Sequence, residues 1–445
     1  MLSEARDTIV ALSTPPGVGA VSIVRLSGPR ALSLAQRRLE SRGASDAVLP
    51  HARARRRWLT RADGRRLDQA VVLAFHAPHS YTGEDVVEFQ LHGSPWLVEE
   101  LLADLRQEAA VAEPGEFTRR AVEHGRLNLS QAEGVRALVE ARSGLAHNLA
   151  LRSLSGDAGR RVQVLLQELL DLLSLVEAEL DFAEHEIDPT PVAVLRSRAG
   201  AAIERLEAWR ASWRLGRLSH GAQVVLAGEP NAGKSTLMNA LLEDSRVLVD
   251  EDPGTTRDAI AQELRLGDLS VTLWDTAGLR DSESRVERQG VARTRELLET
   301  ADVILLLRAP HQSGIPELTE RASCLPVLTK SDLANAETDR RPGELAVSAL
   351  TSAGLTELKA ALHQRLVTED LHSLDLVLTE ARHVQLVDLA AQCLRRFCAA
   401  LAAGLDRPLA ATDLREAAEA VGAIVGGADF DDLYPLIFSR FCVGK

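Results

Sequence analysis

The chain has 445 residues, of which 45% are hydrophobic and 26% charged, and its formal net charge at pH 7 is −13. This length predicts two to four domains, and the charge argues against a protein that coats nucleic acid non-specifically, although a local basic patch remains possible. The four cysteines, Cys324, Cys393, Cys398 and Cys442, have neither metal-ligand spacing nor the density of a disulfide scaffold. Because neither a signal peptide nor an apolar run of membrane-spanning length is evident, we expect a cytoplasmic protein without membrane contact.

Residues 1 to about 120 have the pattern of a mixed α/β domain. Strands are expected at 7–12, 18–26, 69–75 and 86–91, and helices at 30–40 and 95–108. A basic run comprises Arg53, Arg55, Arg56, Arg57, Arg61, Arg65 and Arg66, and it brackets a possible hairpin turn at Asp63-Gly64. A solvated face is the favoured interpretation of this run, and an RNA contact is the alternative.

Two helical blocks flank an α/β block in the rest of the chain. Apolar residues recur at helical spacing from about 127 to 213, most clearly at 162–180, and again at 373–403 and 412–425. We expect these outer segments to pack as a single bundle from which the inner block emerges. The expected domains are therefore 1–120 (α/β), 121–217 and 367–445 (helical) and 218–366 (an inserted doubly wound sheet).

The inserted block begins with the string GEPNAGKST at 228–236, placed between an apolar run and a helical pattern. This is the P-loop motif in its strand–loop–helix context. Gly228 and Gly233 allow the tight turn, Lys234 is expected to reach the β- and γ-phosphates, and the Ser235 hydroxyl is expected to hold Mg²⁺. Further strands are expected at 260–266, 270–274, 303–307, 326–329 and 345–347.

Four later motifs complete the expected nucleotide site. Asp275 of the sequence DTAG is suited to the magnesium shell, and the Gly278 N–H to the γ-phosphate. The Thr256 hydroxyl is expected to complete Mg²⁺ coordination. Asp332 of TKSD can accept from the guanine N1–H and exocyclic amine together, which adenine does not offer. Ser348-Ala349 follows the next strand, where a backbone N–H can contact the base carbonyl, so the motifs together predict a GTPase.

Two departures from Ras-like GTPases concern the mechanism of hydrolysis. Leu279 stands where Ras-like proteins carry a water-orienting glutamine, and no arginine finger is evident. A monovalent cation can supply the missing charge, and the side-chain carbonyl of Asn231 is suited to bind K⁺. A bracing role for Asn231 in the loop is the alternative.

With these motifs, the chain closely resembles the tRNA modification GTPase family MnmE, also called TrmE, over essentially its full length. The resemblance rests on strings shared with that family, at 8–11, 15–17, 25–28, 82–85, 114–117, 129–133, 254–258, 275–280 and the terminal 441–445. It implies an N-terminal folate-binding and dimerising α/β domain and a helical bundle split by the Ras-like GTPase domain. It also implies K⁺-activated GTP hydrolysis that modifies carbon 5 of the wobble uridine of certain tRNAs, by aminomethyl or carboxymethylaminomethyl addition.

The same resemblance implies cofactors and partners. 5-Formyltetrahydrofolate or a related tetrahydrofolate would supply the one-carbon unit, and a flavoprotein, MnmG, would carry the FAD. The chain would act as a homodimer and join MnmG in a heterotetramer that binds tRNA. Arg25, Glu88, Arg126 and the terminal Lys445 would form the folate site. Because the family commonly has lysine at position 126, the arginine there keeps the charge and changes the hydrogen-bond geometry.

The resemblance also assigns roles in the GTPase domain. Glu287 would orient the attacking water through a second water, and Thr255 lies in the loop that encloses K⁺. The expected contacts to nucleotide and cations are Asn231, Ala232, Gly233, Lys234, Ser235, Thr236, Asp250, Glu251, Asp252, Pro253, Gly254, Thr255, Thr256, Asp275, Thr276, Ala277, Gly278, Thr329, Lys330, Ser331, Asp332, Ser348, Ala349 and Leu350. Asp250 and Asp252 either strengthen cation binding or face water, and Thr329 replaces the usual asparagine of NKxD.

Cys442 has two interpretations: a small buried apolar residue, or a thiol that adds to carbon 6 of the uracil ring and so activates carbon 5. Two alternatives to the enzyme are also considered. A GTP-dependent switch that binds rRNA in ribosome assembly shares the GTPase motifs, but a recognisable RNA-binding module is not found. A P-loop kinase is disfavoured by Asp332.

Overall fold

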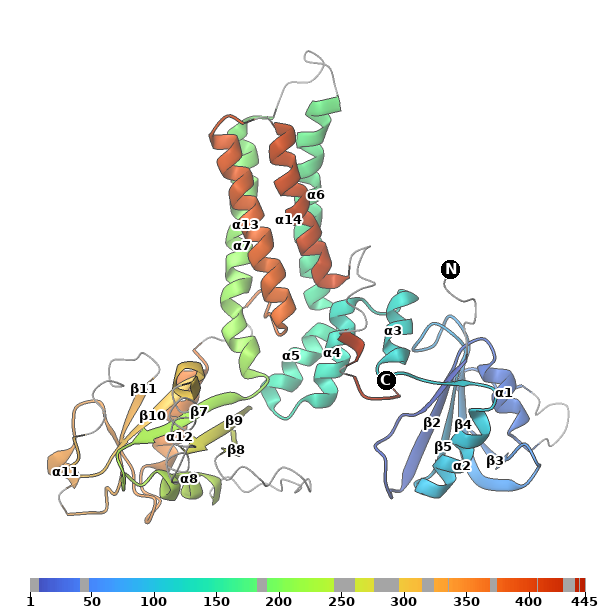
Figure 1. The fold of residues 1–445 in the computed structure, drawn as a ribbon, viewed down its shortest axis with the longest axis horizontal. Helices are drawn as coiled ribbons and strands as arrows, with labels where there is room; N and C mark the ends of the chain where they lie inside the picture. The colour runs from blue at the N-terminus through green and yellow to red at the C-terminus, as the bar shows by residue number, and fades with distance from the viewer. Residues whose placement is uncertain are drawn as a thin grey trace, which may run out of the picture. The chain divides into compact units, whose positions relative to one another are not determined.

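The computed structural model describes residues 8–40, 48–181, 190–243, 261–275, 296–313, 324–334, 336–368, 374–405, 407–426, 437–439 and 441–444 (Figure 1). The chain divides into two compact units. The first consists of Met1–Arg136, Ser153–Gln163 and Gly422–Lys445, and the second of Ala137–Arg152 and Val164–Val421. Within the described part of the chain, no helix has the length and hydrophobicity that a membrane crossing requires.

The first unit is built on a six-stranded sheet with the order β3-β4-β5-β2-β1-β6. Its strands are β1 (Ile9–Leu12), β2 (Val21–Ser27), β3 (Arg55–Thr60), β4 (Arg66–Phe75), β5 (Val86–His92) and β6 (Ala110–Val111). Neighbouring strands are antiparallel except for the parallel pair β1 and β6. The predicted strands are confirmed, and so is the hairpin at Asp63-Gly64, where Gly64 has a φ of 84°. The second predicted strand begins at Val21 rather than at residue 18.

Helices cover one face of this sheet. Along β4, buried residues alternate with partly exposed ones, as expected for a strand with one covered face. Its buried residues join a core with α1 (Ala31–Arg37) and α2 (Pro95–Leu105). The opposite face carries Arg25 and Glu88 on neighbouring strands, and α3 (Glu116–Glu123) and α4 (Leu129–Glu140) follow in the chain.

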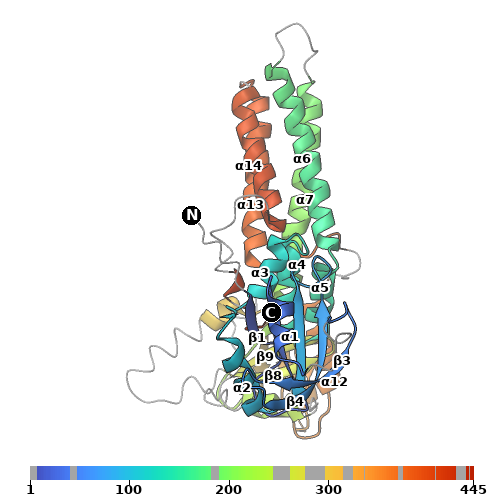
Figure 2. The ribbon, with the colours of Figure 1, turned by 90° about the vertical axis from the view of Figure 1, so that its right-hand side faces the viewer.

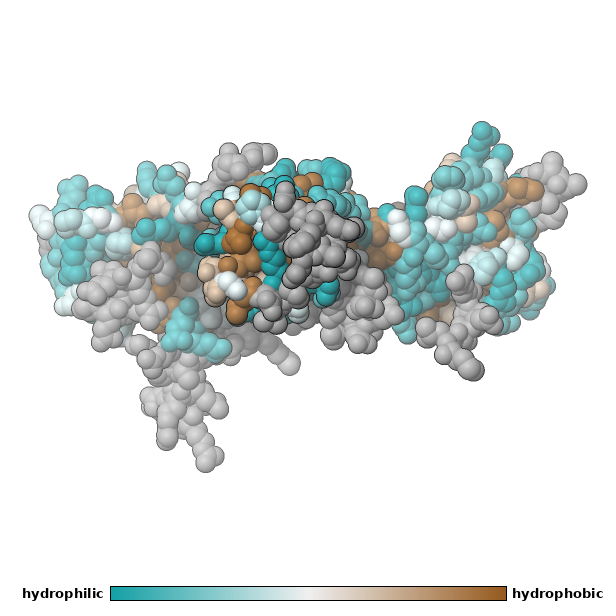
Figure 3. All heavy atoms as spheres, turned by 90° about the horizontal axis from the view of Figure 1, so that it is seen from above, coloured by the Kyte–Doolittle hydropathy of each residue, from teal (hydrophilic) through white to brown (hydrophobic). Residues whose placement is uncertain are grey.

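Long helices run side by side in the bundle (Figures 1 and 2). They are α6 (Asp157–Asp181), α7 (Val192–Leu218), α13 (Ala381–Ala402) and α14 (Arg407–Val425), preceded in the chain by α5 (Gly144–Leu154). Arginine–carboxylate pairs join them along their exposed sides, such as Arg205 with Glu168 and Arg210 with Asp388. Figure 3 looks along the bundle and shows apolar residues toward its middle and hydrophilic residues around them. The segments before and after the inserted block therefore pack together.

The predicted helix at 373–403 is wrong in its first turns, because α13 begins only at Ala381. Residues 374–380 are not helical and contact α7 instead. The Leu378 N–H donates to Ser212 Oγ at 3.1 Å. A Cβ on Gly216 would lie 1.7 Å from the Leu378 carbonyl oxygen, so glycine is required for this close approach. Contacts with α7 thus override the local helical spacing.

The inserted block forms a second six-stranded sheet with the order β12-β11-β10-β7-β9-β8. The strands are β7 (Ala222–Gly228), β8 (Ala261–Leu266), β9 (Leu269–Asp275), β10 (Val303–Arg308), β11 (Cys324–Leu328) and β12 (Leu345–Ala346). All neighbours are parallel except β8 and β9. With α8 (Lys234–Glu243), α11 (Ala336–Asp339) and α12 (Leu355–Leu366), this confirms the predicted doubly wound sheet. Because five strands run the same way, the loops after their carboxyl ends meet at one edge.

Candidate functional site

The P-loop connects the central strand β7 to α8, as the sequence predicts. A Cβ on Gly228 would lie 2.5 Å from the Leu307 carbonyl oxygen, so only glycine fits where β7 passes β10 into the loop. Asn231 and Gly233 have φ values of 64° and 83°, which turn the backbone so that N–H groups can face a bound anion. Lys234 is buried, and its Nζ donates to the carbonyls of Gly228 and Glu229 at 3.0 Å each.

A hydroxyl and a carboxylate meet beside the P-loop. The Ser235 Oγ, at the start of α8, donates to Asp275 Oδ2 at the end of β9 over 2.5 Å. Asp275 is 6% exposed, so its oxygens face the protein interior and the site. Hydroxyl and carboxylate oxygens are the ligands that Mg²⁺ prefers in nucleotide sites. These two residues, brought together from separate elements, fit a magnesium ion bound between loop and strand.

The residues expected to recognise the base come together at the ends of β11 and β12. Ser348 Oγ donates to Asp332 Oδ1 at 2.6 Å and accepts the Thr351 N–H at 3.2 Å, which fixes the carboxylate. The backbone N–H of Ser331 donates to the Val347 carbonyl at 3.2 Å, and Lys330 has a φ of 54°. The Asp332 carboxylate therefore has a defined position from which its remaining lone pairs can accept from a purine edge.

The loop after β11 is also tied to the P-loop. Thr329 Oγ1 donates to the Ala232 carbonyl at 2.7 Å, so threonine at the position of the usual asparagine connects the two motifs. A second tie comes from Gln312, whose side-chain N–H donates to the Pro230 carbonyl at 2.9 Å. The base and phosphate halves of the site thus form one hydrogen-bonded frame.

A buried arginine stabilises this hydrogen-bonded frame. Arg308, at the end of β10, is 3% exposed and donates to Glu344 at 2.7 and 2.9 Å and to Asp339 at 2.7 Å. Burial raises the pKa of Glu344, but the Arg308 guanidinium and the Arg341 N–H lower it more, so the net pKa is below its usual value. The Arg308 carbonyl accepts from the Thr329 backbone N–H at 2.9 Å. The position of the loop after β11 therefore depends on this charged pair.

The first unit has its own ligand-sized cavity, of about 500 Å³. Arg25, Glu88 and Arg126 all line it, so the structure brings together the three described residues expected to hold folate. The other lining residues are Phe75, His79, Ser80, Tyr81, Val86 and Val135. Apolar walls with a few charged groups are typical of a small-molecule site. Unlike Arg25, Arg126 has no recorded side-chain partner among the described residues.

Arg25 is held from several sides. Its guanidinium donates to Glu88 at 2.9 Å and to the Gly444 carbonyl at 3.2 Å, and it lies 5.8 Å from the Tyr81 ring centre and 5.6 Å from that of Phe117. Gly444 has a φ of 93°, and a Cβ there would lie 2.2 Å from the Leu12 carbonyl oxygen. The glycine near the chain end is therefore required for this approach. The C-terminal segment therefore lies beside the cavity, although it is far from Arg25 in the sequence.

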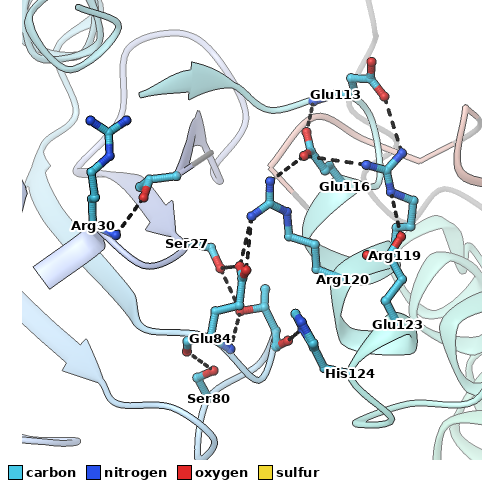
Figure 4. A network of polar contacts seen from close by, with 12 residues as sticks. Ser27, Arg30, Ser80, Glu84, Glu113, Glu116, Arg119, Arg120, Glu123 and His124 are labelled. Atoms are coloured by element: carbon cyan, nitrogen blue, oxygen red, sulfur yellow. Dashed lines mark hydrogen bonds and ion pairs between the residues drawn. The ribbon is translucent and has the colours of Figure 1, made fainter. Parts of the chain in front are cut away.

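Polar contacts fix the loop that supplies Ser80 and Tyr81 (Figure 4). Arg120 of α3 donates to Glu84 at 3.0 Å and to Glu116 at 2.8 Å, and Ser27 Oγ donates to Glu84 at 2.8 Å. Tyr81 and Thr118 are joined by a hydroxyl–hydroxyl hydrogen bond of 2.9 Å. The shared string at 82–85 thus has a structural purpose, because Glu84 anchors this side of the cavity to α3.

Several expected site residues lie outside the described residues: Asp250, Glu251, Asp252, Pro253, Gly254, Thr255, Thr256, Thr276, Ala277, Gly278, Leu279, Glu287 and Lys445. Cys442 is described, and its side chain is exposed. Its interpretation as a buried apolar residue is therefore wrong. The chain end is held through the backbone instead, because the Cys442 carbonyl accepts the Gly115 N–H at 3.4 Å and Val443 pairs with Pro114.

Sequence reasoning missed the residues that position the site rather than contact the ligand. Arg308, Glu344 and Gln312 belong to no motif, and Tyr81 and Phe117 are separated from Arg25 by more than fifty residues of sequence. The shared strings at 82–85 and 114–117 were the available signal for the last two, because the first directly follows Tyr81 and the second ends with Phe117.

Comparison with known proteins agrees with this geometry. Residues 8–126 match the family model "GTP-binding protein TrmE N-terminus", and residues 129–442 match "MnmE helical domain". Proteins named tRNA modification GTPase MnmE are 38% identical over 455 residues in Syntrophotalea carbinolica and 40% identical over 444 residues in Thermus thermophilus, with 99% of both chains covered in each case. The protein of the same name from Neisseria meningitidis serogroup C is 40% identical over 458 residues, with both chains fully covered. The chain therefore belongs to the MnmE family of tRNA modification GTPases.

Proposed function

We propose that this protein hydrolyses GTP to drive modification of carbon 5 of the wobble uridine in certain tRNAs. The observation that carries the proposal is the presence, in one chain, of two built sites. One is a hydrogen-bonded frame that presents Asp332, Ser235 and Lys234 to a guanine nucleotide. The other is a cavity with Arg25, Glu88 and Arg126, whose surroundings include the C-terminal segment.

In the GTPase site, each group has a chemical role. Lys234 neutralises charge on the β- and γ-phosphates, and Ser235, Asp275 and Thr256 hold the Mg²⁺, which stabilises the charge developing on the transferred phosphoryl group. The family resemblance assigns Glu287 to orient the attacking water. The Asn231 carbonyl is the ligand for K⁺, whose charge replaces that of an arginine finger.

The cavity in the first unit is the proposed site for 5-formyltetrahydrofolate or a related tetrahydrofolate, which supplies the one-carbon unit. Arg25 and Glu88 neutralise each other at 2.8 Å and together offer donors and an acceptor to a polar ring edge. Arg126 is exposed and is the cation left for a ligand carboxylate, with Lys445 at the chain end. The flavoprotein MnmG, carrying FAD, is the proposed partner in a heterotetramer with the homodimer.

The proposed division of the chain has four parts: a folate-binding domain at 1–120, helical parts at 121–217 and 367–445, and the GTPase domain at 218–366.

Nucleoside analysis of tRNA tests the function. In cells lacking this protein, the modified wobble uridine should be lost and restored by the wild-type chain. A ribosome-assembly switch would instead leave the tRNA nucleosides intact and cause ribosomal precursors to accumulate.

Turnover of GTP should rise about tenfold or more when Na⁺ is replaced by K⁺, because a preorganised charge beside the phosphates stabilises the transition state. Asn231→Gly is the matched variant, since glycine keeps the φ of 64° and removes the carbonyl ligand. Its turnover should no longer distinguish the two cations. Equal wild-type rates in both salts would contradict the potassium mechanism.

Cys442→Ser should leave GTP turnover unchanged and abolish tRNA modification, because serine keeps the size of the side chain and lacks the thiolate nucleophile. The measurement pairs a phosphate-release assay with nucleoside analysis of tRNA from complemented cells. Cys398→Ser, a partly exposed cysteine of α13, is the control and should retain both activities. Full modification with Cys442→Ser would rule out the thiol mechanism.

A further inference from the structure

The N-terminal sheet ends at a strongly basic strand. β3 is the outermost strand in the order β3-β4-β5-β2-β1-β6 (Figure 1). Between residues 48 and 66 the sequence has seven arginines and one acidic residue, Asp63, in a chain whose net charge is −13. This concentration of one sign is local, and it lies on a strand with only one neighbour.

Six of these seven arginines fall into two groups, and the seventh, Arg57, is half-buried and has an interaction partner of its own. Arg61, Arg65 and Arg66 are neutralised: Arg61 pairs with Glu100 at 2.5 Å, Arg65 with Asp63 at 3.3 Å, and Arg66 with Glu40 at 2.7 Å. Arg53, Arg55 and Arg56 are exposed, and within the described residues no ion pair or side-chain hydrogen bond is recorded for them. We call these three residues the basic edge.

The basic edge leads toward the cavity. Arg56 is opposite Val71 of β4, whose side chain lies on the same face of the sheet as Phe75, four residues or about 13 Å further along the strand. Phe75 and His79 line the cavity. His51 lies between these two residues and the arginines, and it pairs with Ala74. The centre of its ring is 5.7 Å from that of His76 and 6.3 Å from that of His79. Imidazole rings are among the side chains on which unstacked RNA bases stack.

We propose that the basic edge binds the phosphate backbone of the tRNA and leads the anticodon loop along the imidazoles to the cavity. This inference rests on the proposed function, which supplies a tRNA substrate and a one-carbon donor in that cavity. Arginines without carboxylate partners are free to neutralise phosphates and release counterions. The competing account is that charges on an edge strand only prevent strand-to-strand aggregation.

The test compares the full-length wild type with the triple variant Arg53→Gln, Arg55→Gln, Arg56→Gln. The probe is a tRNA transcript with uridine at the wobble position, and its dissociation constant is measured from 50 to 200 mM KCl. We expect the slope of log affinity against log salt to fall in magnitude by about two to three, and affinity at 150 mM to fall about tenfold or more. GTP turnover without tRNA should not change, because the basic edge belongs to the other compact unit.

A matched control removes the same charge elsewhere: Arg205→Gln, Arg210→Gln, Arg395→Gln, three exposed bundle arginines paired with Glu168, Asp388 and Glu207. Its tRNA affinity and salt slope should remain close to those of the wild type. An equal loss in both triple variants would overturn the inference in favour of a non-specific charge effect. Unchanged tRNA binding by the basic-edge variant would overturn this inference and leave the proposed function standing. This holds whether or not the variant aggregates or changes its native mass. Absence of tRNA binding by the wild type would overturn the proposed tRNA substrate as well.

Discussion

Asp332→Asn is expected to reverse the base preference of the GTPase, weakening GTP binding about a hundredfold while xanthosine triphosphate becomes the better ligand. The carboxylate can accept two hydrogen bonds from guanine, and each bond to a charged group contributes about 1.5–3 kcal/mol. Asparagine keeps one acceptor and gains a donor, which matches the carbonyl that xanthine carries in place of the amine. Binding of both nucleotides to the full-length chain, by fluorescence titration, provides the measurement.

Two further variants define the cause of this effect. Ser348→Ala removes the hydroxyl that donates to Asp332 at 2.6 Å, so we expect weaker binding of GTP with guanine preference retained. Asp388→Asn removes the same charge from an exposed pair with Arg210 in the bundle, and it should change neither affinity. If Asp332→Asn binds GTP as tightly as the wild type, the proposed base contact is refuted.

Arg308→Met should lower the free energy of unfolding by about 3–5 kcal/mol, because it leaves the Glu344 carboxylate buried without its cation. Methionine retains much of the volume of the side chain, so the loss reports the charge rather than a cavity. Arg205→Met is the matched control, since its pair with Glu168 is exposed and should contribute at most about 1 kcal/mol. Urea denaturation of the full-length chain, followed by circular dichroism, compares them, and equal stabilities would contradict the supporting role of Arg308.

This loss should depend on pH in a defined direction. The pKa of Glu344 is below its usual value of 4.5 in the folded protein, so folding favours the charged carboxylate. Its contribution is therefore complete above the usual pKa and disappears as the pH falls through the lower folded value. The stability difference between wild type and Arg308→Met should be largest near neutral pH and should shrink below about pH 4.5. A difference that grows with acidity would contradict the pair.

The nucleotide half of the fold could be read from the sequence because its signals are local. A buried strand, a glycine turn and a helix start occupy consecutive positions at 222–243, and DTAG and TKSD begin at or directly after the end of a strand of the same sheet. In such a sheet, the carboxyl ends of the strands meet at one edge. The order of strands and motifs thus predicted that Ser235 would lie near Asp275, and the structure places their oxygens 2.5 Å apart.

The same reasoning was less reliable where packing decides the conformation. Helical spacing predicted a helix through 374–380, but Gly216 and Ser212 of α7 hold that segment in a non-helical form. Of the two interpretations of Cys442, the buried one is wrong, because Phe441 is buried while the cysteine beside it is exposed. Neither outcome depends on local propensity alone.

By itself, then, the sequence determined the strand–loop–helix units, the guanine-specific aspartate and the family, since periodicity and motif spacing are properties of neighbouring residues. Only the tertiary structure decided which distant residues support them. Arg25 is surrounded by Glu88, Phe117 and the carbonyl of Gly444, and Arg308 is neutralised by residues that belong to no motif. Such partners are chosen by burial, because a charged group removed from water must find its counterpart wherever the folded chain places one.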